Sequence, residues 1–244
     1  MTARPTALVV AGPGTNRDRD LVLAFELAGA DASIVLTSEL AADPGVLDRA
    51  QLLAVAGGFS YGDALGAGRM LALDLTSGDT ALDAAMQHFV AAGKPVIGIC
   101  NGFQALTRAG LLPGALGHNA HGRFECRWVQ IDPEPASHCL WTAGLTQPIH
   151  CPIAHGEGRY VHPDPDGLTA AGQVALRYRS TNPNGSTADI AGVCNAAGNV
   201  LGLMPHPENF VVPRQHPHHR AGADHTDHLG LRLFHNGVAA AREA

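Results

Sequence analysis

The chain has 244 residues, 45% of them hydrophobic, and a formal net charge of -6, so it is long enough to bury a sizeable core. Because it has no block of basic residues and no apolar run near the roughly 20 residues that span a bilayer, we expect it to bind neither nucleic acid nor a membrane. Five cysteines without C-x-x-C spacing are typical of a reduced cytoplasmic protein that has neither a disulfide framework nor a cysteine zinc site.

The first half of the chain alternates apolar runs with segments of helical spacing. Short apolar runs predict a buried strand at residues 7–11 and further strands at 33–36, 52–56 and 95–99. Apolar residues at helical spacing predict helices at residues 21–28, 82–90 and 103–109. This alternation predicts an α/β fold, an open and mostly parallel doubly wound sheet with helices on both faces. In such a sheet, functional groups gather at the carboxyl ends of the strands.

The second half is richer in strands, and we expect some of them to add antiparallel to the same sheet. Apolar patterns predict these strands at residues 124–131, 149–160, 174–178, 189–194 and 200–204. No linker or change of composition separates the two halves, so the sequence predicts a single domain over residues 1–244. Its last part, residues 211–244, is predicted to hold a histidine-rich loop and a terminal helix within residues 223–241.

Cys100 stands between the predicted strand at 95–99 and the helix that follows it. Gly98 and Gly102 flank it in the pattern G-x-C-x-G, the cysteine counterpart of the G-x-S-x-G nucleophile elbow. A tight turn brings the chain so close to its neighbours that only a residue without Cβ fits on either side. The helix N-terminus offers free N–H groups and a partial positive charge, which favour a thiolate. Cys100 is therefore the candidate nucleophile, and the alternative is a buried structural cysteine.

A thiolate nucleophile requires a base that carries its proton and a third group that orients the base. His206 and Glu208 follow a predicted strand, and two-residue spacing in an extended, proline-stiffened segment is expected to place both on one side. His155 and Glu157 share this spacing after another predicted strand, so the two pairs compete for the role. We interpret residues 155–159 as a loop on the substrate side or at an interface, the alternative being a surface hairpin.

Gly57 and Gly58 end the predicted strand at 52–56 and provide a second functional element. A tetrahedral intermediate needs backbone N–H donors aimed at its oxyanion. We expect the N–H of Gly58, or of a neighbour, to pair with that of Asn101 directly after the nucleophile. The alternative is an ordinary turn with glycine at positive φ.

Three further features carry weaker predictions. Residues 182–186 contain Asn-Gly and predict a turn, with a binding role only secondary. The histidine-rich stretch fits no defined set of metal ligands, so we expect a solvated loop and no metal site; its histidines are His216, His218, His219, His225 and His228. Residues 12–14 are rich in glycine but match neither nucleotide-binding fingerprint.

The motifs at 98–104 and 205–208 resemble those of the triad-type (class I) glutamine amidotransferases. Further segments narrow the resemblance, and they lie at 13–16, 18–20, 57–63, 111–114, 123–129, 153–160, 182–186 and 198–204. In this order they are similar to the glutaminase subunits of phosphoribosylformylglycinamidine synthase, an enzyme of de novo purine (IMP) synthesis. The match runs from about residue 7 to about residue 210.

The resemblance implies the chemistry of each triad residue. Cys100 would attack the side-chain amide of glutamine, and His206, oriented by Glu208, would carry the proton to the leaving ammonia. Water would then release glutamate from the γ-glutamyl thioester. The resemblance thus selects His206 as the base over His155.

The resemblance also implies how substrate and partners bind. Gly58 and Asn101 would form the oxyanion hole, while Gly57 and Gln104 would face the bound glutamine. Ammonia would pass to a separate synthetase subunit, which uses ATP and Mg to convert formylglycinamide ribonucleotide into the amidine, and a small third subunit would bridge the two. This chain is too short to include the synthetase, so no cofactor is expected in it.

One segment departs from the family pattern, and two alternative functions stay open. Similar small subunits often carry an aromatic residue and an arginine in the segment that corresponds to residues 64–69, and this chain does not follow that pattern. The segment is more similar to the glutaminase domain that is fused into long single-chain synthetases. A stand-alone γ-glutamyl hydrolase would be strongly active in isolation. A non-catalytic regulatory subunit would keep the fold alone, and the intact Cys100, His206 and Glu208 argue against it.

Overall fold

The computed structural model describes residues 3–76, 81–219 and 228–243. Within these residues the main sheet has nine strands, which are β1 (Thr6–Ala11), β2 (Asp31–Leu36), β3 (Leu52–Val55), β4 (Val96–Ile99), β6 (Glu125–Pro133), β7 (Ile149–His155), β9 (Val174–Tyr178), β10 (Ile190–Cys194) and β11 (Val200–Leu203). Two short strands form a separate antiparallel pair, β5 (Ala115–Gly117) and β8 (Arg159–Val161). The α-helices of the described chain are α1 (Asp18–Ala28), α2 (Thr37–Ala42), α3 (Arg69–Thr76), α4 (Ala81–Ala91), α5 (Asn101–Arg108), α6 (Pro165–Ala170) and α7 (Leu231–Ala241).

The strand order of the main sheet is β2-β1-β3-β4-β11-β10-β9-β6-β7. Neighbouring strands from β2 to β11 are parallel, and those from β11 to β7 are antiparallel. The predicted α/β fold with antiparallel additions to the same sheet is therefore confirmed. Because β4 lies between β3 and β11, the loops that follow these three parallel strands meet at one edge of the sheet.

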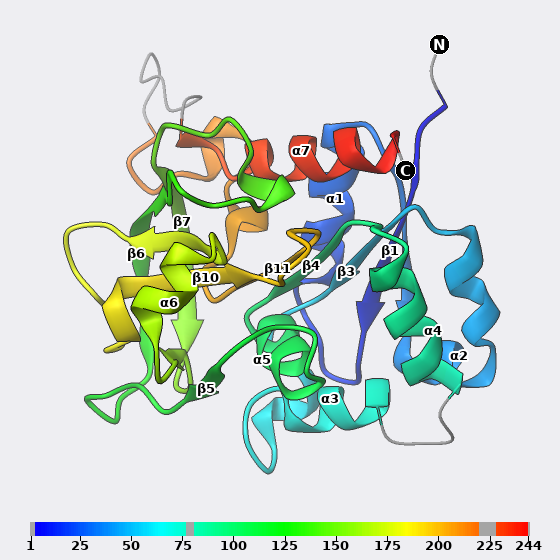
Figure 1. Ribbon diagram of the computed structural model, residues 1–244, viewed down its shortest axis with the longest axis horizontal. Coiled ribbons are helices and arrows are strands. Elements are labelled where there is room, and N and C mark those ends of the chain that lie inside the picture. The colour runs from blue at the N-terminus through cyan, green and yellow to red at the C-terminus, as the bar shows by residue number, and fades with distance from the viewer. Residues whose placement is uncertain (1–2, 77–80, 220–227, 244) are drawn as a thin grey trace.

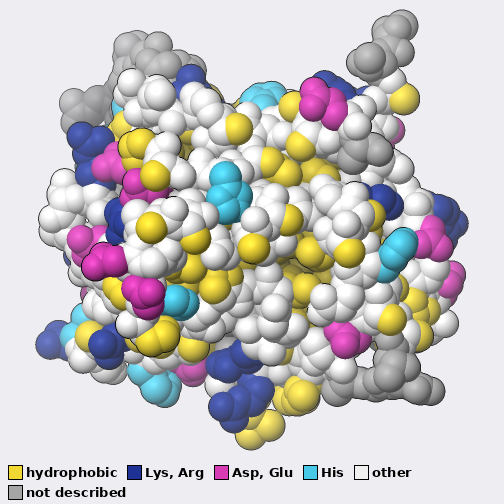
Figure 2. Space-filling model, viewed as in Figure 1, with side chains coloured by type: hydrophobic (Ala, Val, Ile, Leu, Met, Phe, Trp, Pro, Cys, Tyr) yellow, Lys and Arg dark blue, Asp and Glu magenta, His cyan; other side chains and the backbone are white. Residues whose placement is uncertain are grey.

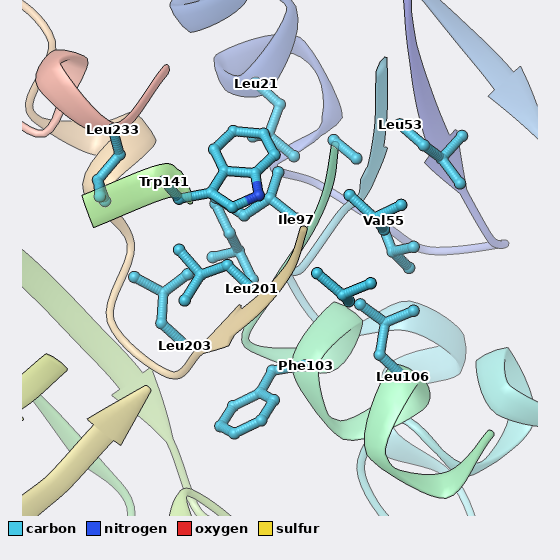
Figure 3. Packing of buried hydrophobic residues seen from close by; sticks show 14 of the residues in the cluster. Leu21, Leu53, Val55, Ile97, Phe103, Leu106, Trp141, Leu201, Leu203 and Leu233 are labelled. Atoms are coloured by element: carbon cyan, nitrogen blue, oxygen red, sulfur yellow. The ribbon is translucent and has the colours of Figure 1, made fainter. Parts of the chain in front are cut away.

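Helices cover both faces of this sheet (Figure 1). The α1 helix packs against α7 on one face, and α3 packs against α5 on the other. Figure 3 shows the core between these layers, with Trp141 near Leu233 on one side of the strands and Phe103 and Leu106 of α5 on the other. Trp141 is fully buried, and its Nε1–H donates to the carbonyl oxygen of Asn199 at 3.1 Å, so its polar edge is satisfied.

The single strand predicted at residues 149–160 is wrong. The chain breaks after His155, and β8 begins only at Arg159 and pairs with β5 instead of β6. Two glycines make the break, and Gly158 passes so close to His155 that a Cβ on it would overlap the imidazole ring. The break turns residues 155–158 into a loop at the end of β7.

The helices α3 and α6 were not predicted, α2 lies where the sequence left a helix or a loop open, and the terminal helix is shorter than expected. In α3, Leu71, Leu73 and Leu75 alternate as in a strand, but Leu71 and Leu75 are buried beneath the helix while Leu73 is exposed. The α6 helix is also absent from the sequence prediction. The α7 helix begins at Leu231, and the region 220–227, in which the sequence places its start, lies outside the described residues.

The surface mixes charged and apolar groups. On the face shown in Figure 2, basic and acidic side chains are interspersed. Among the large hydrophobic side chains of the described chain, Leu65 is the most exposed, at 75%, in the loop between β3 and α3. Every helix in the described residues is too short or too polar to span a bilayer.

Candidate active site

Cys100 occupies a sharp turn between β4 and α5. Its backbone angles are φ 53° and ψ -106°, in a region that residues with a side chain rarely adopt, so the turn is strained. Hydrogen bonds hold this conformation, since Cys100 N donates to Leu203 O at 2.9 Å and Gln104 N donates to Cys100 O at 3.0 Å. Cys100 therefore lies at the N-terminus of α5, the position that the elbow pattern predicts, and its side chain is buried.

The two glycines of the elbow are required for space. A Cβ on Gly98 would lie 2.5 Å from Leu106 Cδ1 and 2.7 Å from the carbonyl carbon of Gly102, and a Cβ on Gly102 would overlap the carbonyl oxygen of Val55 in β3. Neither glycine has a positive φ. The steric reason predicted for these residues is confirmed: the first turn of α5 packs directly on the neighbouring strand.

His206 follows β11, the strand beside β4, and Glu208 lies two residues further on. His206 Nδ1 is 2.6 Å from Glu208 Oε1, and both side chains are buried. The predicted contact is confirmed, but the predicted extended backbone is wrong, because Pro207–Asn209 form a short 3-10 turn. His206 N donates to Pro152 O of β7 at 2.9 Å, which fixes the start of this turn.

The charges around His206 favour its protonated form. Burial alone lowers the pKa of His206, but Glu208 and Cys100 together outweigh burial and raise it to about 10. At neutral pH the His206 imidazole is therefore protonated and can give a proton to a leaving group.

Gly57 and Gly58 bring the end of β3 against the nucleophile. A Cβ on Gly57 would lie 2.5 Å from the carbonyl oxygen of Ile99 and 2.9 Å from Cys100 Cβ. Gly58 has a φ of 95°, and a Cβ on it would overlap Asn16 Oδ1. The backbone thus passes the nucleophile as closely as glycine allows. Several non-glycine residues of the loop that follows also have positive φ, namely Phe59, Tyr61, Asp63 and Leu65.

Two buried amides connect α5 to the loops that border the site. Asn101 Nδ2 donates to Asp63 Oδ1 at 2.7 Å and to Gln104 Oε1 at 3.1 Å, while Asn101 Oδ1 accepts from Ser60 N at 3.3 Å. Gln104 Nε2 donates to Glu157 O at 2.7 Å. Both ends of the Gln104 amide are therefore bound to the protein, which holds residues 155–158 beside the nucleophile helix. Contact of Gln104 with glutamine stays a prediction.

His155, the competing base, is bound by an amide in place of a carboxylate. Its Nδ1 lies 3.1 Å from Asn119 Oδ1, and Gly158 N donates to the same oxygen at 3.0 Å. Burial, assisted by the charge of His206, lowers the pKa of His155 to about 4, so its ring is neutral at neutral pH. The carboxylate-oriented imidazole is therefore His206. Sequence reasoning missed Asn119, since nothing in its local pattern marks a buried amide.

The predicted turn at 182–186 is confirmed, and it supports the same loop. Asn182 Oδ1 accepts from Gly185 N at 2.8 Å and from Ser186 N at 3.1 Å. Asn184 is fully buried, and its Nδ2 donates to Gly158 O at 2.8 Å. The turn therefore also holds residues 155–158 in place.

The histidine-rich segment packs away from this site, on β6 and β7. His150 Nδ1 lies 3.5 Å from His216 Nε2, and the His150 ring stacks on His228 with centroids 4.4 Å apart. A cavity of about 500 Å³ lies beside His216, His218 and Trp128. His225 lies outside the described residues, and within them no group of three or more metal-ligating side chains could hold an ion. All five cysteines are free.

Comparison with known protein families gives one match over nearly the whole chain. Residues 4–239 match the model of the CobB/CobQ-like glutamine amidotransferase domain. The chain is 47% identical to phosphoribosylformylglycinamidine synthase subunit PurQ of Treponema denticola, over 87% of this chain and 90% of the relative. It is 39% identical to the subunit of the same name from Dehalococcoides mccartyi, over 97% of each chain.

Solved structures agree with these relatives. A chain of the PurLQS structure from Thermotoga maritima superposes with a TM-score of 0.79 at 37% identity, covering 97% of this chain and 99% of that one. The glutaminase domain of Trypanosoma brucei CTPS superposes with a TM-score of 0.64 at 13% identity, covering 98% and 94% of the two chains. This second likeness concerns the fold alone.

Proposed function

The chain belongs to the CobB/CobQ-like glutamine amidotransferase domain family and to the PurQ subunits of phosphoribosylformylglycinamidine synthase, and on this premise we propose that Cys100 is its glutaminase nucleophile. The chain hydrolyses glutamine to glutamate and ammonia. The synthetase subunit uses this ammonia to convert formylglycinamide ribonucleotide into formylglycinamidine ribonucleotide in de novo purine biosynthesis. The observation that carries the proposed site is the buried His206–Glu208 pair facing a strained cysteine.

The reaction begins with Cys100 as a thiolate and with His206 protonated. Cys100 Sγ attacks the amide carbon of glutamine and forms a tetrahedral intermediate. His206 then gives its proton to the departing nitrogen, and the C–N bond breaks. Ammonia departs, and the γ-glutamyl group remains bound to the sulfur as a thioester. Water attacks the thioester while His206 takes one of its protons, and glutamate and the thiolate are released. Glu208 keeps the imidazole oriented and stabilises its charge in both steps.

Oxyanion stabilisation is assigned to the backbone on either side of the nucleophile. The N–H of Asn101 opens α5, where the first helical donors lack partners within the helix, and Gly58 lies in the loop that touches Cys100 through Gly57. The glycine at position 57 gives the substrate room at the nucleophile. Asn101 and Gln104 hold these parts together through their side chains.

The chain works within a complex that contains a synthetase subunit, as its similarity to a PurLQS chain indicates. We further propose a small bridging subunit, ATP and Mg bound by the synthetase alone, and no cofactor in this chain. Five free thiols support a cytoplasmic location. A single glutamine amidotransferase domain over residues 1–244 is supported by a sheet that takes strands from both halves of the chain.

The test combines the chain with its synthetase partner and compares two nitrogen sources. With Cys100→Ala, we expect amidine formation from glutamine to be lost and amidine formation from added ammonium to persist. If glutamine still supports synthesis in this variant, the nucleophile assignment fails. If the parent chain hydrolyses glutamine rapidly alone and the synthetase does not increase the rate, a stand-alone hydrolase is the better description.

A further inference from the structure

His155 is held in one orientation by an amide whose own orientation is fixed. Asn119 Nδ2 donates to Arg123 O at 2.8 Å and to His155 O at 2.9 Å, so Asn119 Oδ1 is the acceptor on the other side. His155 Nδ1 lies 3.1 Å from that oxygen and must therefore carry the ring proton. Gly158 packs against the face of the ring. The imidazole is thus a fixed tautomer with a bare lone pair on Nε2.

That lone pair has no partner. His155 is 3% exposed, and its Nε2 is buried without a hydrogen bond. Leaving a buried acceptor unpaired is costly, so such an atom in a native fold calls for an explanation. The low pKa of His155 means that the lone pair stays unprotonated at neutral pH. A group that donates an N–H or O–H would relieve this cost.

The loop that carries His155 borders the active site. Residues 155–158 are tied to the nucleophile helix through the bond between Gln104 and Glu157 O, and Gln104 is bound to Asn101 next to Cys100. His206 N donates to Pro152 O of β7, so the base lies against the same strand that ends at His155. Nδ1 and the ring face are already occupied by Asn119 and Gly158. A donor must therefore reach Nε2 from another side, and the loop that carries His155 borders the nucleophile helix.

We propose that His155 Nε2 binds the ammonia released at Cys100 and holds it as neutral NH₃ before it passes to the synthetase. This inference rests on the proposed function. Ammonia carries three N–H donors and is as small as a water molecule, so it suits one buried acceptor. It forms next to His206, which supplies its last proton. A neutral imidazole accepts an N–H without giving a proton back, so ammonia keeps the lone pair that it needs for amidine formation.

The test measures how many glutamates form for each amidine in the complex of the full chain with its synthetase. His155→Asn keeps an amide where Nδ1 lies but removes the acceptor, whereas His155→Gln places an amide oxygen near the position of Nε2. We expect one glutamate per amidine in the parent and a ratio raised about fivefold in His155→Asn, the factor that one neutral hydrogen bond is worth. His155→Gln should give an intermediate ratio.

Controls separate this role from others. His150→Gln changes another histidine of β7 and should keep the parent ratio, while added ammonium should support synthesis equally in every variant. The inference is overturned if His155→Asn keeps a ratio of one glutamate per amidine. If the ratio stays at one while KM for glutamine rises about tenfold, His155 instead contacts the charged ammonium group of the substrate. A parent that makes no amidine from glutamine overturns the proposed function as well.

A second measurement needs no substitution. In the parent chain with ¹⁵N-labelled histidine, ammonium chloride at alkaline pH, where neutral ammonia is present, should shift the His155 Nε2 resonance and leave Nδ1 unchanged. If Nε2 does not respond, or if both nitrogens shift together, ammonia does not bind there.

Discussion

Gly57→Ala tests whether the close approach of the β3 end to the nucleophile sets the catalytic geometry. The added Cβ would lie 2.5 Å from the carbonyl oxygen of Ile99 and 2.9 Å from Cys100 Cβ, which the elbow holds in place. Ordinary contact begins at 3.4 Å, so the loop and the elbow must move apart by about 0.9 Å. A misplacement of about 1 Å in a catalytic site costs about 10²-fold in rate.

The assay is amidine formation in the complex with the synthetase, from glutamine and from added ammonium. We expect the glutamine-dependent kcat of Gly57→Ala to fall about 10²-fold, while the ammonium-dependent kcat stays at the parent value. Overpacking of this kind costs about 1–3 kcal/mol, so the Tm should fall by about 2–12 °C for a chain of this size. The variant should therefore remain folded under assay conditions.

The matched control is Gly117→Ala in β5, where an added Cβ would meet nothing within 4 Å. This variant should keep both activities and the parent Tm. The reasoning is refuted if Gly57→Ala retains glutamine-dependent turnover close to that of Gly117→Ala. Equal loss of both activities in Gly57→Ala would also contradict it, because the damage would then extend to the synthetase.

Three further changes have distinct expected outcomes. Glu208→Gln should move the pKa of His206 from about 10 toward its ordinary value and lower glutamine-dependent kcat by about 10²–10⁴-fold, as a pH–rate profile would show. Folding lowers the pKa of His155 to about 4, so its contribution to the free energy of unfolding is full above the ordinary pKa of histidine and is lost as pH falls toward 4. Between about pH 7 and pH 5, denaturant titrations should therefore show the parent losing about 2 kcal/mol more of its free energy of unfolding than His155→Asn. Gly237→Ala would place a Cβ 2.5 Å from Trp141 Cη2 and should lower the free energy of unfolding by about 1–3 kcal/mol, measured in the same titrations, without changing KM for glutamine.

The central parts of the site could be predicted because their geometry is local. Gly98, Cys100 and Gly102 define the elbow within five residues, and the structure shows that the steric reason for both glycines is correct. His206 and Glu208 are two residues apart, so their contact needs only one turn of the chain. The strands β1, β3 and β4 followed from apolar runs that lie buried in the parallel part of the sheet.

The parts that could not be predicted depend on partners distant in sequence. Asn119 binds His155, and Asn184 binds Gly158, but neither asparagine differs locally from a loop residue. The leucines of α3 alternate in the sequence, and their helix depends on packing against distant helices such as α5. The 3-10 turn after His206 likewise depends on a hydrogen bond to β7, which the spacing of residues in one segment does not reveal.

The bond from Cys100 N to Leu203 O joins the strands that carry nucleophile and base at the centre of the nine-stranded sheet. The Cys100 amide will therefore exchange its hydrogen with solvent only when the sheet centre unfolds, whereas residues 59–65 lie outside the sheet and we expect them to open without it. A docked partner thus has little power to change the distance between thiol and imidazole. A partner would instead change the reaction rate by ordering residues 59–65. Hydrogen exchange of the amides at 59–65, measured with and without the synthetase, would show this ordering.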